Sequence, residues 1–298
     1  MRFYVSWYPG DPWYPLYDDE CAMLISVASV SNAWSLDGCS PPPRYLMLDS
    51  GGFRYAAAPG ERPQPKVVFE RQLDIIRGRK TETILCALDY PIVDSDLSSN
   101  EIARCLDQTI AYAYEFKQLS LQAALPKHIQ LMGVVQGYDA SSFAYCANRL
   151  RSIGFQTYGV GSLAPIKKKQ EILDRVGPVA EVLEQDLHVF GVTAVETVED
   201  LATLGVTSVD SSRPAKAAAY NQVFYSEPFR CLSIAEGMDR WGKSRAPHRR
   251  ISEALVCACP VCGGTANPDI LKLGARRHNA VRAVHNYWHL KRALSSSP

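Results

Sequence analysis

The sequence predicts a parallel (β/α)8 barrel, and three features of its 298 residues support this fold class. Apolar runs of strand length alternate with helix-like stretches, which indicates a parallel sheet covered on both faces. About seven or eight such units over some 230 residues favour a closed barrel over an open sheet. The glycine-rich fingerprint of dinucleotide-binding sheets is missing, which argues against a nicotinamide enzyme.

The expected elements follow one another in a regular order. Strands are predicted at residues 3–6, 46–48, 83–88, 129–135, 158–160, 188–190 and 206–209. Helices are predicted at residues 67–78, 99–121, 140–152, 167–176 and 198–204. The second helix has a start signal, because Ser98 can cap it and Glu101 places an acid in its first turn.

Composition fits a cytoplasmic globular protein. Hydrophobic residues make up 47% of the chain and charged residues 21%, enough for a sizeable core. The longest apolar run, residues 21–30, is shorter than the roughly 20 residues that a membrane helix needs, and serines interrupt it. The first residues, Met1 to Val5, lack the layout of a signal peptide. Six of the nine cysteines are scattered, as is usual for small core residues in a reducing compartment.

Charge divides the chain into two parts. Residues 240–298 hold eleven Lys and Arg against two acids, about +9, so residues 1–239 hold 21 basic and 29 acidic residues, about −8. A basic end on an acidic body suggests a polyanionic partner, although a charged, solvated helical surface would look the same. We expect a barrel over 1–239 and a basic subdomain with a terminal helix over 240–298.

Polar or small residues follow several of the expected strands. They are Asp49, Asp89, Gln136, Gly161 and Asp210. Any one of them could simply form a turn. In a (β/α)8 barrel, however, the active site lies at the carboxyl ends of the strands, so all five would converge on one mouth. Three carboxylates and an amide at one mouth indicate a catalytic site.

Five motifs resemble those of the queuine/archaeosine tRNA-guanine transglycosylase family, in the family's order. They are LDSGGF (48–53), VVQG (134–137), YGVGSLA (158–164), FGVTAVETVEDLATLGVTSVDSSRP (190–214) and CACPVC (257–262). The resemblance spans roughly residues 44 to 290. It implies a (β/α)8 barrel with a zinc-binding insertion or tail, and the exchange of guanine in a nucleic acid for a 7-deazaguanine base.

The resemblance implies roles for two carboxylates. Asp210 falls where the family has its nucleophile, which attacks the anomeric carbon and expels guanine. The incoming base then displaces the enzyme, so that the configuration is retained. Asp49 matches the general acid/base that protonates the leaving base and deprotonates the incoming one.

The same resemblance implies a base-binding set. It comprises Ser50, Phe53, Asp89, Gln136, Gly161 and Phe190. Asp89 would accept hydrogen bonds from purine N–H groups, and Gln136 would contact the carbonyl edge. Gly161 would let backbone amides approach the ring. The two phenylalanines would sandwich the base. Taken singly, each of these residues could instead be a core residue, a helix cap or a plain turn.

The cysteine cluster predicts a structural zinc site. Cys257, Cys259 and Cys262 lie within six residues, which suits one tetrahedral ion, and a disulfide would leave one thiol over. A histidine should supply the fourth ligand, and His278, His285 and His289 lie on a predicted C-terminal helix. His278 and His285 both precede an asparagine, as the family's ligand does, and they are seven residues apart on one helix face. We predict His278, because the helix that follows it matches the family's final helix in length.

The resemblance also bears on which nucleic acid is the substrate, DNA or tRNA. The chain reaches Asp49 after 48 residues, whereas the tRNA enzymes should have a longer segment there. Its opening, MRFYVSWYPGDPWYP, resembles that of phage and bacterial relatives that insert 7-deazaguanines into DNA, and the C-terminal region is compact. We therefore favour DNA as the polymer and preQ0 (7-cyano-7-deazaguanine) as the base. The residues expected to hold phosphates, or else to be surface charge, are Arg213, Lys216, Arg240, Lys243 and Arg245.

Three other functions stay open at this point: a tRNA-guanine transglycosylase, a non-catalytic nucleic-acid-binding partner subunit, and a glycosidase or nucleosidase acting on a small substrate. The presence of both Asp49 and Asp210 argues against a non-catalytic partner subunit. The basic zinc-binding subdomain argues against an enzyme that acts on a small substrate. No membrane partner is expected. The sequence leaves open whether the protein forms a homodimer or needs a helper protein.

Overall fold

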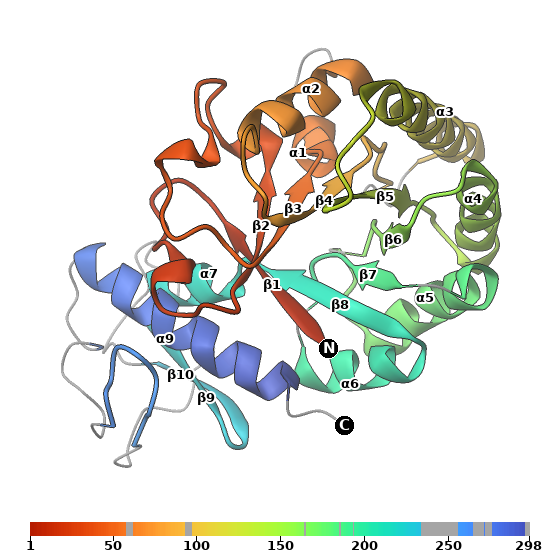
Figure 1. The fold of residues 1–298 in the computed structure, drawn as a ribbon. Helices are drawn as coiled ribbons and strands as arrows, with labels where there is room; N and C mark the ends of the chain where they lie inside the picture. The colour runs from red at the N-terminus through yellow and green to blue at the C-terminus, as the bar shows by residue number, and fades with distance from the viewer. Residues whose placement is uncertain are drawn as a thin grey trace.

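The fold is a closed eight-stranded barrel, seen along its axis in Figure 1. The computed structural model describes residues 1–57, 62–92, 97–163, 165–184, 186–192, 194–233, 256–264, 271 and 276–295. The strands are β1 (Arg2–Trp7), β2 (Ala22–Ser26), β3 (Tyr45–Asp49), β4 (Glu82–Cys86), β5 (Ile129–Val135), β6 (Thr157–Val160), β7 (Leu187–Val189) and β8 (Val206–Ser211). Each pairs in parallel with the next, and β8 closes the barrel on β1, which confirms the predicted fold class.

One strand was not among those predicted. β2 is fully buried and lies within the apolar run at residues 21–30. A short apolar run with serines has no periodicity that separates a strand from a buried helix. Its pairing with β1 and β3, which completes the barrel, assigns it as a strand.

Helices cover the outside of the barrel. They are α1 (Gly52–Ala57), α2 (Pro65–Ile75), α3 (Ser99–Ala123), α4 (Ala140–Ile153), α5 (Lys169–Leu183), α6 (Val195–Thr203) and α7 (Arg213–Ala219), with short 3₁₀ turns at Tyr14–Leu16, Val27–Ser29 and Leu36–Gly38. The predicted cap of α3 is confirmed as a capping box, because Ser98 and Glu101 each accept a backbone hydrogen bond from the other. Helix α5 continues past the predicted end at residue 176, because Val179 and Leu183 keep its apolar face on the core despite Pro178.

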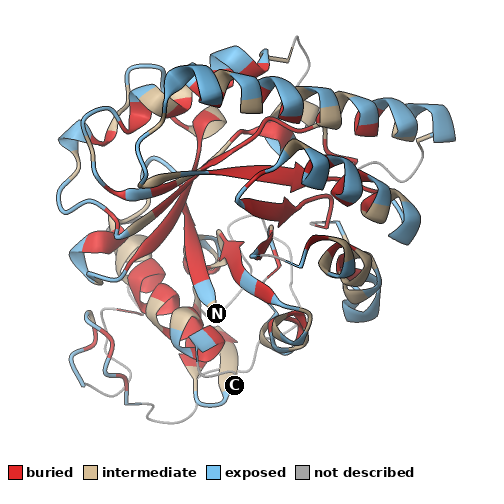
Figure 2. Ribbon diagram, turned by 45° about the vertical axis from the view of Figure 1, so that its right-hand side comes forward, coloured by how far each residue is buried: buried red, intermediate tan, exposed pale blue. Residues whose placement is uncertain are grey.

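Burial separates two apolar layers (Figure 2). The larger layer lies between the strands and the helices, whose outer faces are exposed in the figure. The smaller layer fills the barrel interior with inward-facing residues, among them Tyr4, Leu24, Met47 and Met132. Side chains alternate along a strand, so the next inward positions of β1, β2 and β3 are polar: Ser6, Ser26 and Asp49. The barrel therefore changes from an apolar filling to a polar mouth at the carboxyl ends of its strands.

A second, smaller unit packs beside β1 and α7. It contains the antiparallel hairpin β9 (Gln222–Ser226) and β10 (Phe229–Ser233), the segment 256–264 and helix α9 (Arg276–Ser295). Three hairpin residues, Val223, Tyr225 and Leu232, form one apolar cluster with the three cysteines of the segment. The predicted boundary between residues 239 and 240 lies outside the described residues.

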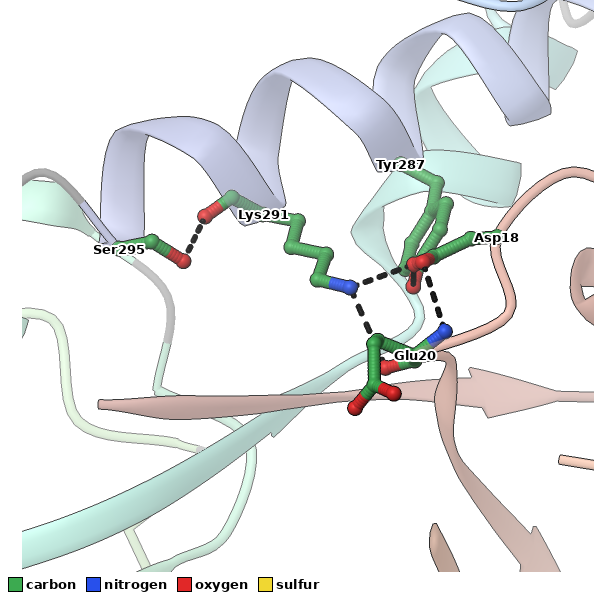
Figure 3. A network of polar contacts seen from close by, with 5 residues as sticks. All are labelled: Asp18, Glu20, Tyr287, Lys291 and Ser295. Atoms are coloured by element: carbon green, nitrogen blue, oxygen red, sulfur yellow. Dashed lines mark hydrogen bonds and ion pairs between the residues drawn. The ribbon is translucent and has the colours of Figure 1, made fainter. Parts of the chain in front are cut away.

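Helix α9 is fastened to the loop that precedes β2 (Figure 3). The Asp18 carboxylate accepts hydrogen bonds from the Tyr287 hydroxyl and from Lys291 Nζ, the latter across 2.6 Å. Lys291 Nζ also reaches the Glu20 carbonyl oxygen at 3.2 Å. These contacts join the end of the chain to its beginning. None of the described helices combines the length and the apolar character needed to cross a membrane.

Candidate active site

The five predicted strand-end residues lie around one cavity. It has a volume of about 590 Å³ and opens at the carboxyl ends of the strands. Its lining includes all five of them: Asp49, Asp89, Gln136, Gly161 and Asp210. A hollow of similar volume, about 610 Å³, lies between α3 and α4, but among the described residues Asp107 is the only carboxylate in its lining. Three carboxylates and the Gln136 amide thus share the one cavity at the barrel mouth.

Asp210, near the end of β8, is held on both carboxylate oxygens. The Ser6 hydroxyl donates to Oδ2 across 2.7 Å, and the Gly191 backbone N–H donates to Oδ1 across 2.8 Å. His188 Nε2 lies 3.4 Å from Oδ1, and Ser208 Oγ lies 2.9 Å from the other ring nitrogen. Because the Ser208 hydroxyl can donate to Nδ1, the imidazole can carry its proton on Nε2, facing the carboxylate. These contacts hold the Asp210 carboxylate, which is only 7% exposed, in one orientation.

Asp49 ends β3 and lies partly buried on the same mouth. Its carboxylate accepts hydrogen bonds from the Ser26 side chain and from the Gly51 backbone N–H, the latter across 3.1 Å. Burial raises the pKa of Asp49, and the negative charge of Asp210 raises it further, against those hydrogen bonds. A carboxyl group with a raised pKa keeps its proton to higher pH, which suits a residue that gives and takes a proton.

Asp89 lines the same cavity and is 6% exposed. The Ser50 hydroxyl donates to its Oδ1 across 3.0 Å, and the Gln136 amide donates to its Oδ2. Burial raises the pKa of Asp89 to about 7, helped by the charge of Asp49. The carboxylate lies so close to the backbone of Gly52 that a side chain there would collide with it. A glycine is therefore required at the start of α1, because only a residue without a Cβ leaves room for the Asp89 carboxylate.

Gln136 follows β5 and is buried between two loops. Its side chain contacts Asp89 on one side and Ser162 on the other. It also passes directly over the backbone of Gly161, where a Cβ atom would collide with the amide group. The close approach of this amide explains why Gly161 of the YGVGSLA motif is a glycine. A plain turn would not require one.

The two predicted aromatic residues line the cavity on different loops. Phe53 lies on α1 and is 57% exposed, so it contributes little to the core. Phe190 follows β7 and is half-buried, with the edge of its ring packed on His188 at 4.5 Å between ring centroids. An exposed aromatic ring at a cavity mouth is available to stack on a planar ligand.

The predicted phosphate-binding cations have different surroundings. Lys216, on α7, lines the cavity. Arg213 starts the same helix, but it is not among the cavity residues, and its guanidinium group lies over the rings of Phe224 and Phe229 at 5.3 and 5.7 Å. The other three predicted cations, Arg240, Lys243 and Arg245, lie outside the described residues.

Three cysteines and one histidine form a candidate metal site. Cys257, Cys259, Cys262 and His285 are all buried, and their ligand atoms lie within 4.8 Å of one another. The three sulfurs lie 3.6, 3.5 and 3.4 Å from His285 Nδ1. A tetrahedral zinc ion with ordinary Zn–S and Zn–N bonds requires about 3.5 Å between these atoms. The four residues therefore fit a structural zinc ion with a closed ligand set.

The predicted fourth ligand, His278, was wrong, and His285 takes its place. Both lie on one face of α9, but seven residues separate them by about 10 Å along the helix axis, so only one can reach the sulfurs. His285 Nε2 lies 2.8 Å from the Phe224 carbonyl oxygen on β9. That bond places the ring proton on Nε2 and leaves the Nδ1 lone pair for the metal.

The metal site also supports the wall of the cavity. Asn286, next to the histidine ligand, donates to the carbonyl oxygens of Pro214 at 3.1 Å and Gln222 at 3.0 Å, and it accepts from the Phe224 N–H at 2.8 Å. Pro214 belongs to α7, the helix that follows Asp210 and carries Lys216. Helix α9 thus holds α7 in place against the barrel.

Sequence reasoning missed four polar residues of the site: Ser6, Ser26, Ser162 and His188. Ser6 and Ser26 have a weak signal, since each occupies the inward position at the end of a strand. His188 lies within a predicted strand, where a histidine looks like an ordinary core residue. Ser162 lies inside a motif, yet its backbone conformation has no sequence signature.

Comparison with known proteins agrees with this site. The model of the family described as "Queuine tRNA-ribosyltransferase" matches residues 43–296. A queuine tRNA-ribosyltransferase of Ruegeria pomeroyi is 24% identical over 237 residues, which cover 74% of this chain and 59% of that protein. Another from Syntrophobacter fumaroxidans is 29% identical over 201 residues, covering 61% of this chain and 52% of that protein. The matches thus span between half and three fifths of the relatives' lengths. The chain belongs to the queuine tRNA-ribosyltransferase family.

Proposed function

We propose that this protein is a guanine transglycosylase, which replaces guanine in a nucleic acid with a 7-deazaguanine base through a covalent Asp210–glycosyl intermediate. The observation that carries the proposal is the single cavity that joins Asp49 and Asp210 with the buried pair Asp89 and Gln136. Family membership supports the same reaction class.

In the first step, an Asp210 oxygen attacks the anomeric carbon of the target nucleotide. A C–O bond forms as the C1′–N9 bond breaks, and the electron pair of the broken bond leaves with guanine. Asp49 supplies the proton that neutralises the departing base, a role that suits its raised pKa. The sugar is then an ester of Asp210.

In the second step, Asp49 takes the proton from the incoming base, whose N9 attacks the anomeric carbon. The C–O bond to Asp210 breaks, and the carboxylate leaves with the electron pair. Ser6 and the Gly191 N–H stabilise the charge that returns to its oxygens. Two inversions retain the configuration, and no oxidant or reductant is consumed.

Base recognition falls to Asp89 and Gln136. An ionised Asp89 accepts from the N1–H and 2-amino groups of guanine, while the Gln136 amide donates to O6. Phe53 and Phe190 hold the two faces of the ring. A 7-deazaguanine presents the same edge, so one pocket serves both bases.

For the polymer we propose DNA, with preQ0 as the incoming base. The support is the resemblance of residues 1–15 to relatives that insert 7-deazaguanines into DNA. The target guanosine would have to leave a duplex, which costs on the order of a few kcal/mol. Lys216, which lines the cavity, would hold a flanking phosphate. The second candidate is tRNA, which is favoured by the names of the two relatives.

An incorporation assay tests the proposal. Purified protein is mixed with radiolabelled guanine or preQ0 and with unmodified tRNA, single-stranded DNA or duplex DNA, and each polymer is digested to nucleosides. Label in DNA that disappears with Asp210→Ala supports the whole proposal. Label in tRNA alone retains the mechanism and overturns the choice of DNA. No label in any polymer indicates a partner subunit, and release of guanine from free guanosine indicates a nucleosidase.

A further inference from the structure

Ser162 adopts a backbone conformation that an L-residue rarely adopts. Its φ is +56°, and it is one of four non-glycine residues with positive φ in the described part of the chain. Two of the others, Ala124 and Glu184, cap helices α3 and α5, and Asn221 follows α7. A left-handed residue is common at such helix ends. Ser162 instead follows a strand and lines the cavity, and strained residues at such places are often functional.

The hydroxyl of Ser162 connects three loops of the barrel mouth. It accepts the Ile92 backbone N–H across 2.8 Å, on the loop after β4. It donates its own proton to Oε1 of Gln136, on the loop after β5. Ser162 is 8% exposed, so both bonds are shielded from water. The left-handed backbone is what turns this hydroxyl toward the two neighbouring loops.

This contact decides which way round the Gln136 amide lies. With Oε1 facing the Ser162 hydroxyl, the amide NH₂ faces Asp89 and donates to its carboxylate. The reversed amide would place an oxygen against the Asp89 carboxylate and would offer the cavity an acceptor. Ser162 and Asp89 thus act from opposite sides to fix one orientation.

We infer that Ser162 is a specificity-determining positioning residue, which holds Gln136 as a hydrogen-bond donor so that the pocket selects purines with an acceptor at position 6. The inference rests on the proposed function. Guanine and 7-deazaguanines carry O6, which accepts from the amide. Adenine carries an amino group there and an unprotonated N1, so it meets a donor at Gln136 and a carboxylate at Asp89.

Binding of free bases to the intact protein tests this role. Competition against radiolabelled guanine gives the Kd of guanine, of 6-thioguanine and of hypoxanthine. 6-Thioguanine replaces O6 with a poorer acceptor but keeps the groups that face Asp89. Hypoxanthine keeps O6 and lacks the 2-amino group that Asp89 binds. The variants are Ser162→Gly, which suits the positive φ and removes the hydroxyl, and Ser162→Ala. The control is Glu184→Gly, which removes a positive-φ side chain at the far end of α5.

We expect Ser162→Gly to raise the Kd of guanine about tenfold, because roughly one oriented hydrogen bond to a buried group is lost. The Kd of 6-thioguanine should rise by less than about threefold, so that the wild-type preference for guanine over 6-thioguanine nearly vanishes. The preference for guanine over hypoxanthine should not change, since Asp89 provides it. Ser162→Ala should give the same pattern, and Glu184→Gly should leave every Kd unchanged.

Two results would overturn the inference and leave the proposed function standing. One is that the Kd of guanine, 6-thioguanine and hypoxanthine is unchanged in both Ser162 variants. The other is an equal loss for all three bases, which would indicate a purely structural role. If the wild-type protein bound none of the three, the proposed base site would fail, and the inference with it.

Discussion

Ser6 on β1 donates a hydrogen bond to Asp210 on β8 across 2.7 Å, although 204 positions separate the two residues in sequence. They meet because β8 pairs in parallel with β1, with Tyr4 beside Asp210 in the register. Closing the barrel is therefore what completes the surroundings of this carboxylate. The first strand contributes directly to the site, and not only to the core.

Replacing Ser6 with alanine should slow the exchange of bases. The variant removes one of the donors that stabilise Asp210 when it leaves the sugar, and hydrogen bonds to charged groups are worth about 1.5–3 kcal/mol. We expect kcat to fall about 10- to 100-fold, with little change in the KM for the base. Steady-state incorporation of labelled guanine measures both. Ser152→Ala, on the exposed face of α4, is the matched control, and an unchanged kcat in Ser6→Ala would contradict the role.

Guanine binding should depend on pH through Asp89. Its pKa is raised to about 7, and the ionised form is the one that accepts from the base. Affinity should therefore rise as pH increases through 7, with a Kd about tenfold lower at pH 8 than at pH 6. Equilibrium dialysis across this range measures the change. Asp89→Asn should bind weakly at every pH, and a pH dependence that persisted in this variant would assign the effect to another group.

Phe53 should matter for ligands and not for folding. It is 57% exposed, so Phe53→Ala should change the unfolding free energy by less than about 0.5 kcal/mol. Loss of one stacking face should reduce the binding free energy of guanine by about 1–3 kcal/mol, roughly a 5- to 150-fold rise in Kd. Thermal melting and base binding separate the two effects. A large fall in Tm with unchanged binding would show that Phe53 is a core residue.

Zinc binding should require His285 and not His278. His285→Ala removes a ligand, and the variant should bind zinc far more weakly in competition with a chelator. His278→Ala should retain one zinc ion per chain by metal analysis. Equal zinc content in the two variants would contradict the assignment. Because Asn286 ties α9 to Pro214 of α7, the zinc-depleted protein should also lose protection from hydrogen exchange in 213–219.

Much of the site could be read from the sequence because its main residues interrupt apolar runs. Asp49, Asp89 and Asp210 stand at or just after buried strands, where a charged residue is conspicuous, and the barrel fold predicts that such positions converge. The prediction of the fold and of these positions thus rests on local patterns.

The remaining contacts depend on relationships that a local pattern does not contain. Ser6 contacts Asp210 only because β1 pairs with β8 to close the barrel. A serine at a strand end gives no sequence signal of such a contact. His278 and His285 share a helix face, so only the axial position of α9 over the cysteines distinguishes them. The left-handed conformation of Ser162 is set by the packing of three loops around its hydroxyl.

The covalent intermediate on Asp210 is the central claim, and trapping it is the most direct test. Wild-type protein is incubated with radiolabelled DNA or tRNA, quenched in denaturant and separated on a denaturing gel, and the labelled peptide is sequenced by mass spectrometry. The mechanism predicts a labelled protein band that carries the nucleotide on Asp210 and is lost in Asp210→Asn. Active wild-type enzyme with no labelled band, or exchange activity that survives in Asp210→Asn, would contradict it.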